Sequence, residues 1–403
     1  MENRKLLLIV DDEPANIRLA NSILNDDYNL RSATSGPRAL EEAQSTPKPD
    51  LILLDVGMPG MDGYELCRKL KSIPATLDIP VIFLTGRTED EDETQGFEAG
   101  AVDYIHKPFS AAVVKARVKT HILLREAREQ LTSQLMVVHQ ELEMAHELQV
   151  SILPAETPGV SGLKVAARYI PMSAVAGDFY DFISIDENHL GVLIADVSGH
   201  GLPAALIASM LKIALSTQSS VAFRPAMVLD GLNELLHGKF RRQYVTAAYV
   251  YLDLESSIMR YGGAGHPAIL LRSGLCGTVS ELEENGLFLG PFADAVYSSV
   301  EIPIAAGDRV LLYTDGALEC MNEAGEEFGL VRLKQFLETG SGQAAEEFLD
   351  ALLAELWKWA GQASGTPLTD DITLLAIDIL PHVHEPSGGQ RLSQAMDARP
   401  AGF

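Results

Sequence analysis

The sequence predicts an α/β domain, a long amphipathic helix and an α+β domain within a chain of 403 residues. The first third alternates continuous apolar runs with segments that repeat apolar residues at helical spacing; the runs are KLLLIV (5–10), DLILLDV (50–56) and IPVIFLT (79–85). This alternation is typical of a buried parallel sheet with helices on both faces. Beyond residue 153, short runs rich in β-branched and aromatic residues lie between separate helical stretches, which indicates an α+β layered domain.

Length and charge restrict the class of function. A chain this long exceeds one ordinary core and predicts two or three domains. The net charge of −25 argues against a nucleic-acid partner, because phosphate binders carry basic patches. Three separated cysteines (Cys67, Cys276 and Cys320) form neither a paired framework nor a CxxC metal motif, so we expect reduced thiols in a cytoplasmic protein. No apolar run is long enough for a signal peptide or a membrane span, and no membrane association is expected.

The helical segment at 123–152 carries apolar residues at heptad-like spacing. Its seam contains Leu124, Leu131, Leu135, Val138, Leu142, Ala145 and Ile152, and Arg128 and Gln149 interrupt it. Roughly four heptads of this kind predict a coiled coil and hence a homodimer. The alternative is a single amphipathic helix that lies on its own domain.

Polar residues follow the apolar runs of the first domain. Asp11 and Asp12 end the first run, Asp55 lies in the second, Thr85 ends the third, and Lys107 precedes a proline. The carboxyl ends of parallel strands form a ligand crevice, where three carboxylates repel one another unless a cation or proton neutralises them. These residues therefore predict a Mg²⁺ site that accepts a phosphoryl group, with Lys107 and Thr85 pairing with its oxygens.

The motifs IVDDE, LLDVGMPGMDG, FLTG and DYIHKPF make residues 1–120 resemble the receiver domain of two-component response regulators. The resemblance implies a flavodoxin-like, doubly wound, five-stranded parallel sheet whose Asp55 accepts a phosphoryl group from a cognate histidine kinase. It also implies a Mg²⁺ ion held by Asp11, Asp12, Asp55 and the Gly57 carbonyl, with Thr85 and Tyr104 as switch residues and Lys107 as the phosphate partner. The alternative is a receiver-shaped domain that is never phosphorylated.

Aspartates also end apolar runs in the second domain. They are Asp178 in AGDFYD, Asp196 in IADVSGHG, Asp315 in YTDG, and Asp370 with Asp371 in TDDIT. One such aspartate is an ordinary turn former, but four positions across one domain predict a carboxylate cluster at one sheet edge. Buried carboxylates require cations, and oxygen ligands favour Mg²⁺ or Mn²⁺ over zinc. Two such ions about 4 Å apart can activate one water for in-line attack on phosphorus.

Residues 145–380 resemble the SpoIIE-like branch of the PPM, or metal-dependent, serine/threonine protein phosphatases. The motifs in family order are QVSILP, AGDFYD, IADVSGHGLPAAL, VTAAYVYLD, GGAGHPAILLR, GLFLG, GDRVLLYTDGALE and DDITLLAI. The resemblance implies a β-sandwich flanked by helices that holds two Mn²⁺ or Mg²⁺ ions. It makes Asp196 the bridging ligand and places the Val197 carbonyl and Asp178 at the first ion. Asp315 and Asp370 hold the second ion, with Asp371 as the alternative to Asp370.

Some features of this second site stay open. The family's usual GGD is AGD here, with Ala176, and an arginine that would clamp the substrate phosphate has no clear counterpart. His200 has a side chain suited to proton donation to the leaving oxygen, and a structural loop histidine is the alternative. The same two interpretations apply to His266.

The sequence as a whole predicts a cytoplasmic response regulator with a receiver at 1–122, a coiled-coil linker at 123–152, a phosphatase at 153–380 and a disordered tail at 381–403. Its expected substrate is phosphoserine or phosphothreonine on a partner protein, and the family resemblance points to an anti-sigma-factor antagonist of the STAS type. The competing hypothesis is a non-enzymatic adaptor controlled by phosphorylation. A third is an enzyme that acts on a small phosphorylated metabolite.

Overall fold

The computed structural model describes residues 4–86, 95–240, 242–283, 285–340, 342–366 and 368–381. The chain divides into two compact units, Met1–Val138 and His139–Phe403. Apart from Pro381, the tail expected at 381–403 lies outside the described residues.

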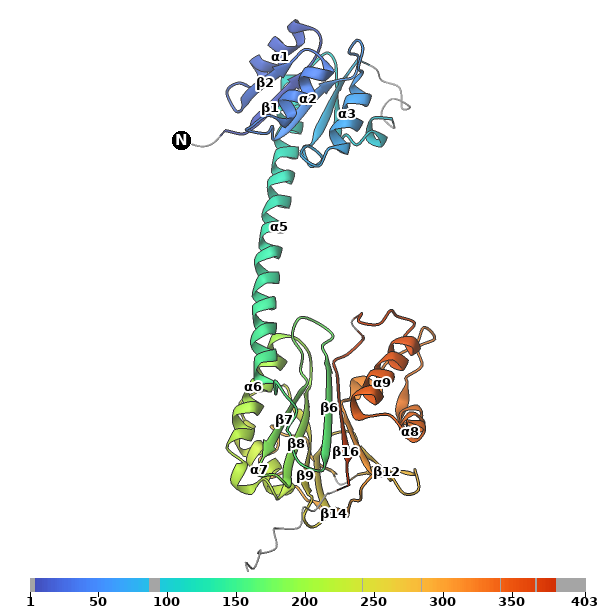
Figure 1. The fold of residues 1–403 in the computed structure, drawn as a ribbon. Helices are drawn as coiled ribbons and strands as arrows, with labels where there is room; N and C mark the ends of the chain where they lie inside the picture. The colour runs from blue at the N-terminus through green and yellow to red at the C-terminus, as the bar shows by residue number, and fades with distance from the viewer. Residues whose placement is uncertain are drawn as a thin grey trace, which may run out of the picture. The chain divides into compact units, whose positions relative to one another are not determined.

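The amino-terminal unit is built on a five-stranded parallel sheet in the order β2-β1-β3-β4-β5 (Figure 1). Its strands are β1 (Leu6–Val10), β2 (Asn29–Ala33), β3 (Leu51–Asp55), β4 (Val81–Thr85) and β5 (Asp103–His106). Its helices are α1 (Pro14–Leu24), α2 (Gly36–Gln44), α3 (Gly63–Ser72) and the first part of α5 (Ala111–Ile152). The predicted doubly wound fold is confirmed.

Both faces of this sheet are buried, as the continuous apolar runs predict. Leu8 and Val10 of β1 pack on one face with residues of α2 and α3. Leu7 and Ile9 pack on the other face with residues of α1 and α5. Because successive side chains of a strand point to opposite faces, a strand covered on both sides must be apolar throughout.

Helix α5 runs without interruption from Ala111 to Ile152, so the predicted linker is the continuation of the last helix of the amino-terminal unit. The first half of the predicted seam is exposed, with 57% exposure at Leu131 and 60% at Leu135. The second half differs, because Gln149 is buried and Ile152 packs against the core of the carboxy-terminal unit. The end of the seam therefore faces its own unit, as the single-helix alternative anticipated.

The carboxy-terminal unit contains two sheets. One has the order β13-β10-β9-β8-β7, with β14 paired to β10, and the other has the order β12-β11-β15-β16-β6. The strands are β6 (Leu163–Ile170), β7 (Phe179–Ser184), β8 (His189–Val197), β9 (Val245–Asp253), β10 (Ile258–Ala264), β11 (Ile269–Arg272), β12 (Val279–Leu282), β13 (Asn285–Gly286), β14 (Val300–Pro303), β15 (Arg309–Tyr313) and β16 (Ile372–Ile379). All these pairings are antiparallel except that of β10 with β13.

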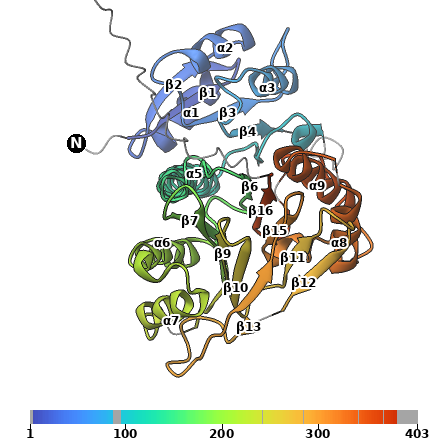
Figure 2. The ribbon, with the colours of Figure 1, turned by 60° about the horizontal axis from the view of Figure 1, so that its bottom comes forward.

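The two sheets form the middle layers of a four-layer unit, with helices outside them (Figure 2). The helices are α6 (Leu202–Ser216), α7 (Pro225–Leu236), α8 (Gly329–Thr339) and α9 (Ala345–Trp359), with short 3₁₀ turns η1 (Ser219–Val221) and η2 (Asp315–Ala317). Leu312 of β15 packs in one core with β8, β9, α6 and α7, whereas its neighbour Leu311 packs with α8 and α9. This alternation confirms the expected sandwich flanked by helices; α8 was not predicted from the sequence.

Candidate functional site

The acids of the amino-terminal unit meet at the carboxyl ends of adjacent strands. Asp11 and Asp12 follow β1, and Asp55 is the last residue of β3, which pairs with β1. Carboxylate oxygens of these three residues all lie within 4.8 Å of one another. An all-oxygen set of this size has the chemistry that Mg²⁺ prefers.

A lysine partly neutralises this cluster. The Lys107 Nζ donates to Asp55 Oδ1 at 2.6 Å and to Asp11 Oδ2 at 2.8 Å. The other oxygen of Asp55 accepts from the Gly57 backbone N–H at 3.1 Å. Burial raises the pKa of Asp55, and the hydrogen bond and charge of Lys107 act against this effect. The cluster keeps an excess of negative charge that a divalent cation would neutralise.

The two expected switch residues, Thr85 and Tyr104, lie on the neighbouring strands β4 and β5. Thr85 is buried at the end of β4, and Tyr104 lies in β5 with its ring under the guanidinium of Arg117 from α5, 5.5 Å from the ring centroid. Asp103 accepts from Arg117 and lies 3.1 Å from Nε2 of His121, which is also on α5. Arg117 and His121 could not be identified from the sequence, because nothing in the pattern of an amphipathic helix shows which charged residue meets a given strand.

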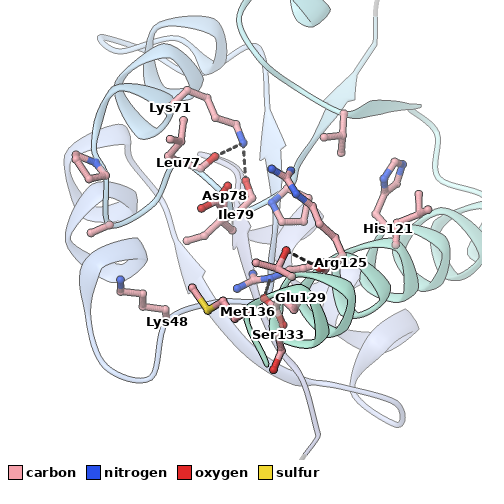
Figure 3. A pocket seen from close by; sticks show the side chains of 17 residues that line it. Lys48, Lys71, Leu77, Asp78, Ile79, His121, Arg125, Glu129, Ser133 and Met136 are labelled. Carbon is pink, nitrogen blue, oxygen red and sulfur yellow. Dashed lines mark hydrogen bonds and ion pairs between the residues drawn. The ribbon is translucent and has the colours of Figure 1, made fainter. Parts of the chain in front are cut away.

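A groove of about 880 Å³ separates α5 from the segment between α3 and β4 in the same unit (Figure 3). Arg125 lines it and donates to the backbone carbonyls of Pro49 and Asp50, at 3.2 and 2.8 Å. The groove lies at the amino ends of β3 and β4, at the opposite edge of the sheet from Asp55. The groove is therefore part of the region where α5 is held to the sheet, and it is separate from the acidic cluster.

Strand register brings the acids of the carboxy-terminal unit together from both sheets. Strands β7 and β8 are antiparallel, and Phe179 of β7 pairs with Ala195 of β8. One position further along each strand, the same register brings Asp178 next to Asp196. In the other sheet, Asp315 follows β15, and Asp370 with Asp371 precedes its partner strand β16. Each sheet thus contributes acids from one pair of adjacent strands.

Asp178 is the most deeply buried of these acids. Its side chain is held by two hydroxyls from the opposite sheet, because Oδ2 accepts from Thr314 Oγ1 at 2.7 Å and from Thr373 Oγ1 at 2.6 Å. Burial and the nearby Asp196 carboxylate raise the pKa of Asp178 well above its usual range, against the effect of the two hydroxyls. The two threonines were not identified from the sequence, although a hydroxyl within an otherwise apolar strand (Thr373) or directly after one (Thr314) is a usable signal.

The other acids repel one another, both within one sheet and between the two sheets. Burial, and then the charges of Asp315, Asp370 and Asp371, raise the pKa of Asp196 to about 7. Burial and Asp370 likewise raise the pKa of Asp315. Crowded carboxylates of this kind are stabilised as anions by cations, and their oxygens fit Mg²⁺ or Mn²⁺. Among the described residues, Asp11, Asp12 and Asp55 are the only group of three or more His, Cys, Asp or Glu residues whose ligand atoms all lie within 4.8 Å of one another.

The adjacent acids Asp370 and Asp371 have different environments. Both oxygens of Asp371 accept backbone N–H bonds, from Met172 and Gly177, each at 2.7 Å. Asp370 is half-exposed, and its Oδ1 accepts from the Asp371 N–H at 2.8 Å. Asp371 therefore holds the backbone next to Asp178, which leaves Asp370 as the better candidate of the two for a cation ligand.

Two glycines allow the segments of the site to approach closely. A Cβ on Gly177 would lie 2.7 Å from the Val197 carbonyl oxygen, one of the expected ligands, and a Cβ on Gly316 would lie 2.0 Å from the Asp371 carbonyl oxygen. Such distances exclude a side chain unless the backbone shifts. These contacts explain why glycine adjoins the site acids Asp178 and Asp315.

The two histidines left open by the sequence differ in burial. His200 is exposed in the loop that follows β8. His266 is 2% exposed, with Nε2 donating to the Tyr313 carbonyl at 3.0 Å and Nδ1 at 3.0 Å from the Thr246 hydroxyl. Burial lowers the pKa of His266 to about 4. These contacts fit a structural function for His266 and leave His200 accessible.

Each of the two units resembles a known protein family. Residues 7–119 match the model of the response regulator receiver domain, and residues 186–380 match that of stage II sporulation protein E (SpoIIE). The chain is 29% identical over 260 residues to phosphoserine phosphatase RsbU of Bacillus subtilis, covering 64% of this chain and 73% of RsbU. It is 47% identical over 128 residues to a probable cyclic di-GMP phosphodiesterase of Vibrio cholerae, covering 32% of this chain and only 29% of that protein.

Among solved structures, the PP2C domain of SiaA from Pseudomonas aeruginosa superposes with a TM-score of 0.54 and 25% identity. The match covers 61% of this chain and 98% of that domain. The fold and the candidate sites define a protein of two units with a group of acidic residues in each unit. The chain combines a response regulator receiver domain with a phosphatase domain of the SpoIIE, PP2C-like type. No helix in the described part of the chain has both the length and the hydropathy needed to cross a bilayer.

Proposed function

We propose that this protein removes phosphate from phosphoserine or phosphothreonine on a partner protein and that its receiver controls the reaction. The observation that carries the proposal is the convergence of Asp178, Asp196, Asp315 and Asp370 from two sheets into one site. Carboxyl groups that are buried this close together stay protonated unless a cation neutralises their charge. A site that brings four of them together is therefore suited to binding cations.

In this proposal, two Mn²⁺ or Mg²⁺ ions would be held by Asp196 together with Asp178, the Val197 carbonyl, Asp315 and Asp370. When bound, the ions would supply an activated water and positive charge for the phosphoryl oxygens. The remaining task of the chain is to hold the ligands in place. Thr314 and Thr373 hold the Asp178 carboxyl through their hydroxyls.

For the receiver, we propose that Asp55 attacks the phosphorus of a phosphohistidine on a cognate histidine kinase. An oxygen–phosphorus bond forms at Asp55 as the nitrogen–phosphorus bond breaks, and the kinase histidine keeps the electron pair of that bond. Mg²⁺ held by Asp11, Asp12 and the Gly57 carbonyl would balance the charge of the phosphoryl group. The Lys107 ammonium, now 2.6 Å from Asp55, is positioned to pair with a phosphoryl oxygen.

The proposed substrate is a phosphorylated anti-sigma-factor antagonist of the STAS type in the cytoplasm. Similarity to RsbU, a phosphoserine phosphatase, supports the phosphoserine class. The exposed seam residues Leu124, Leu131, Leu135 and Val138 on α5 support a homodimer formed by this segment, because a coiled coil would bury them.

The phosphatase activity can be tested on the full-length protein with p-nitrophenyl phosphate and with a phosphorylated STAS-type protein. We expect hydrolysis in Mn²⁺, none in EDTA, and a loss of several orders of magnitude in Asp196→Asn, which removes a ligand charge without changing size. Activity that survives chelation, or an Asp196→Asn variant close to wild type, would contradict the proposal. Binding of the phosphoprotein without hydrolysis would favour the adaptor hypothesis, and hydrolysis restricted to small phosphate esters would favour a metabolite substrate.

The phosphoryl acceptor is tested separately with labelled acetyl phosphate and Mg²⁺. Wild-type protein should acquire a base-labile label that Asp55→Asn lacks, because the amide cannot form the acyl phosphate. Asp50→Asn is a suitable control, since Asp50 also adjoins β3 but at its amino end. Labelling that persists in Asp55→Asn would move the acceptor elsewhere.

A further inference from the structure

Gln149 lies one turn before the end of α5 and is 5% exposed. Its spacing from Leu142 placed it in the predicted coiled-coil seam, where it would weaken a helix pair. The neighbouring residues Leu148 and Val150 are 70% and 45% exposed, so the burial belongs to one face of this turn. That face is directed toward the carboxy-terminal unit itself.

The side-chain amide of Gln149 pairs with both backbone groups of Ala176. Its Nε2 donates to the Ala176 carbonyl oxygen at 2.6 Å, and its Oε1 accepts from the Ala176 N–H at 3.0 Å. Ala176 is fully buried, so its backbone groups have no water to replace these bonds. A two-point contact of this kind fixes both the position and the orientation of the peptide.

Ala176 begins a segment of three residues that are each held by a different partner. Gly177 donates its backbone N–H to Asp371, and Asp178 accepts from Thr314 and Thr373. A chain of two residues spans at most about 7 Å, so a displacement of Ala176 reaches Asp178 directly. Gly177 also packs closely on the Val197 carbonyl, which leaves little room to absorb a shift.

We propose that Gln149 is the positioning residue through which α5 controls the geometry of Asp178. The same helix is hydrogen-bonded within the receiver unit, where Arg125 donates to the carbonyls of Pro49 and Asp50. A change in α5 that follows receiver phosphorylation is therefore transmitted to the catalytic segment as a movement of the Ala176 peptide. This inference rests on the proposed function, namely a phosphatase regulated by its receiver.

The test compares Gln149→Met with wild type in the full-length protein. Methionine keeps the length and apolar stem of the side chain and removes both hydrogen bonds. Gln140→Met is the matched control, because Gln140 is exposed on the same helix. The measurements are Mn²⁺ binding by calorimetry, kcat and KM for p-nitrophenyl phosphate, each with and without acetyl phosphate, and the melting temperature.

We expect Gln149→Met to bind Mn²⁺ about tenfold or more weakly, as is usual when a group that orients ligands is lost. Its kcat should fall while KM for p-nitrophenyl phosphate changes little, and the ratio of kcat with and without acetyl phosphate should approach one. If Gln149 had a purely structural function, Gln149→Met would lower the melting temperature only. Its Mn²⁺ affinity, and its ratio of kcat with and without acetyl phosphate, would then equal those of Gln140→Met once corrected for the folded fraction. That result would overturn the proposal.

If Gln149→Met does not fold, Gln149→Asn provides the same test. Asparagine keeps a polar amide but is one methylene shorter, so from the same helix position it cannot reach both backbone groups of Ala176. It should also weaken Mn²⁺ binding and reduce the response to acetyl phosphate, and wild-type values for both would refute the inference. Wild-type protein without any metal-dependent hydrolysis would instead refute the proposed function, so the two failures are distinguishable.

Discussion

Replacing Thr373 with valine removes one hydroxyl from the deepest acid of the phosphatase site while preserving the shape of the side chain. Thr373 is fully buried, and its Oγ1 donates to Asp178 Oδ2 at 2.6 Å. A hydrogen bond to an ionised group contributes about 1.5–3 kcal/mol. Asp178 must be ionised to bind a cation, so Thr373→Val should weaken Mn²⁺ binding by about 10- to 150-fold.

The effect on the metal-free protein should be smaller. Burial and the Asp196 carboxylate raise the pKa of Asp178 well above its usual range, so without a cation the neutral form of this carboxyl is favoured. A hydrogen bond between neutral groups contributes about 1 kcal/mol, which sets the expected loss in the free energy of unfolding. Thr314→Val should lower the free energy of unfolding by more than Thr373→Val does, because Thr314 Oγ1 also accepts the buried Thr373 N–H at 2.9 Å.

The assay is calorimetric titration with Mn²⁺, with p-nitrophenyl phosphate hydrolysis measured at each concentration and urea unfolding in EDTA. Thr339→Val is the control, since Thr339 is exposed at the end of α8. Mn²⁺ affinity within twofold of wild type in Thr373→Val would refute the assignment of Asp178 as a cation ligand held by this hydroxyl.

Two further predictions concern stability and assembly. Because burial lowers the pKa of His266 from 6.5 to about 4, the unfolded chain binds a proton that the folded chain excludes, and stability should fall as pH falls between these values. Between pH 7.5 and pH 5 the free energy of unfolding should fall by about 2 kcal/mol because of His266. Urea unfolding should show that this free energy declines less steeply with falling pH in His266→Gln than in wild type. Equal declines in the two proteins would contradict the lowered pKa of His266. Leu131 and Leu135 are more than half exposed, so replacing both with aspartate should leave the fold intact but give monomers by light scattering, whereas persistent dimers would exclude this segment as the interface.

The receiver site was predictable from the sequence because its geometry follows from local features. Each strand of a parallel sheet ends at the same edge, so residues that follow apolar runs, such as Asp11 and Asp55, must lie near one another. The tertiary structure added Arg117 and His121, whose contacts depend on how α5 is rotated against β5. A helix pattern specifies a buried face but not which strand a polar residue at its border meets.

In the phosphatase unit, the recurrence of aspartates after apolar runs predicted an acidic cluster, and the strand pairings bring Asp178 beside Asp196. The pattern alone did not distinguish Asp370 from Asp371, since adjacent acids are equivalent in a sequence. The pairing of β16 with β6 decides that Asp371 accepts the N–H group of Met172, and the packing of one sheet against the other decides that it accepts that of Gly177.

Gln149 shows the same division between sequence and tertiary structure. The heptad-like spacing determined that Leu135, Leu142 and Gln149 lie along one side of a long helix, and this much is a consequence of 3.6 residues per turn. Whether a stretch of that side meets a second chain, solvent or its own unit depends on where the rest of the chain packs. The last turns of the helix pack within the phosphatase unit, next to the buried peptide of Ala176. The backbone N–H and C=O of Ala176 require hydrogen-bond partners because water cannot reach them. The Gln149 side-chain amide supplies both an acceptor and a donor.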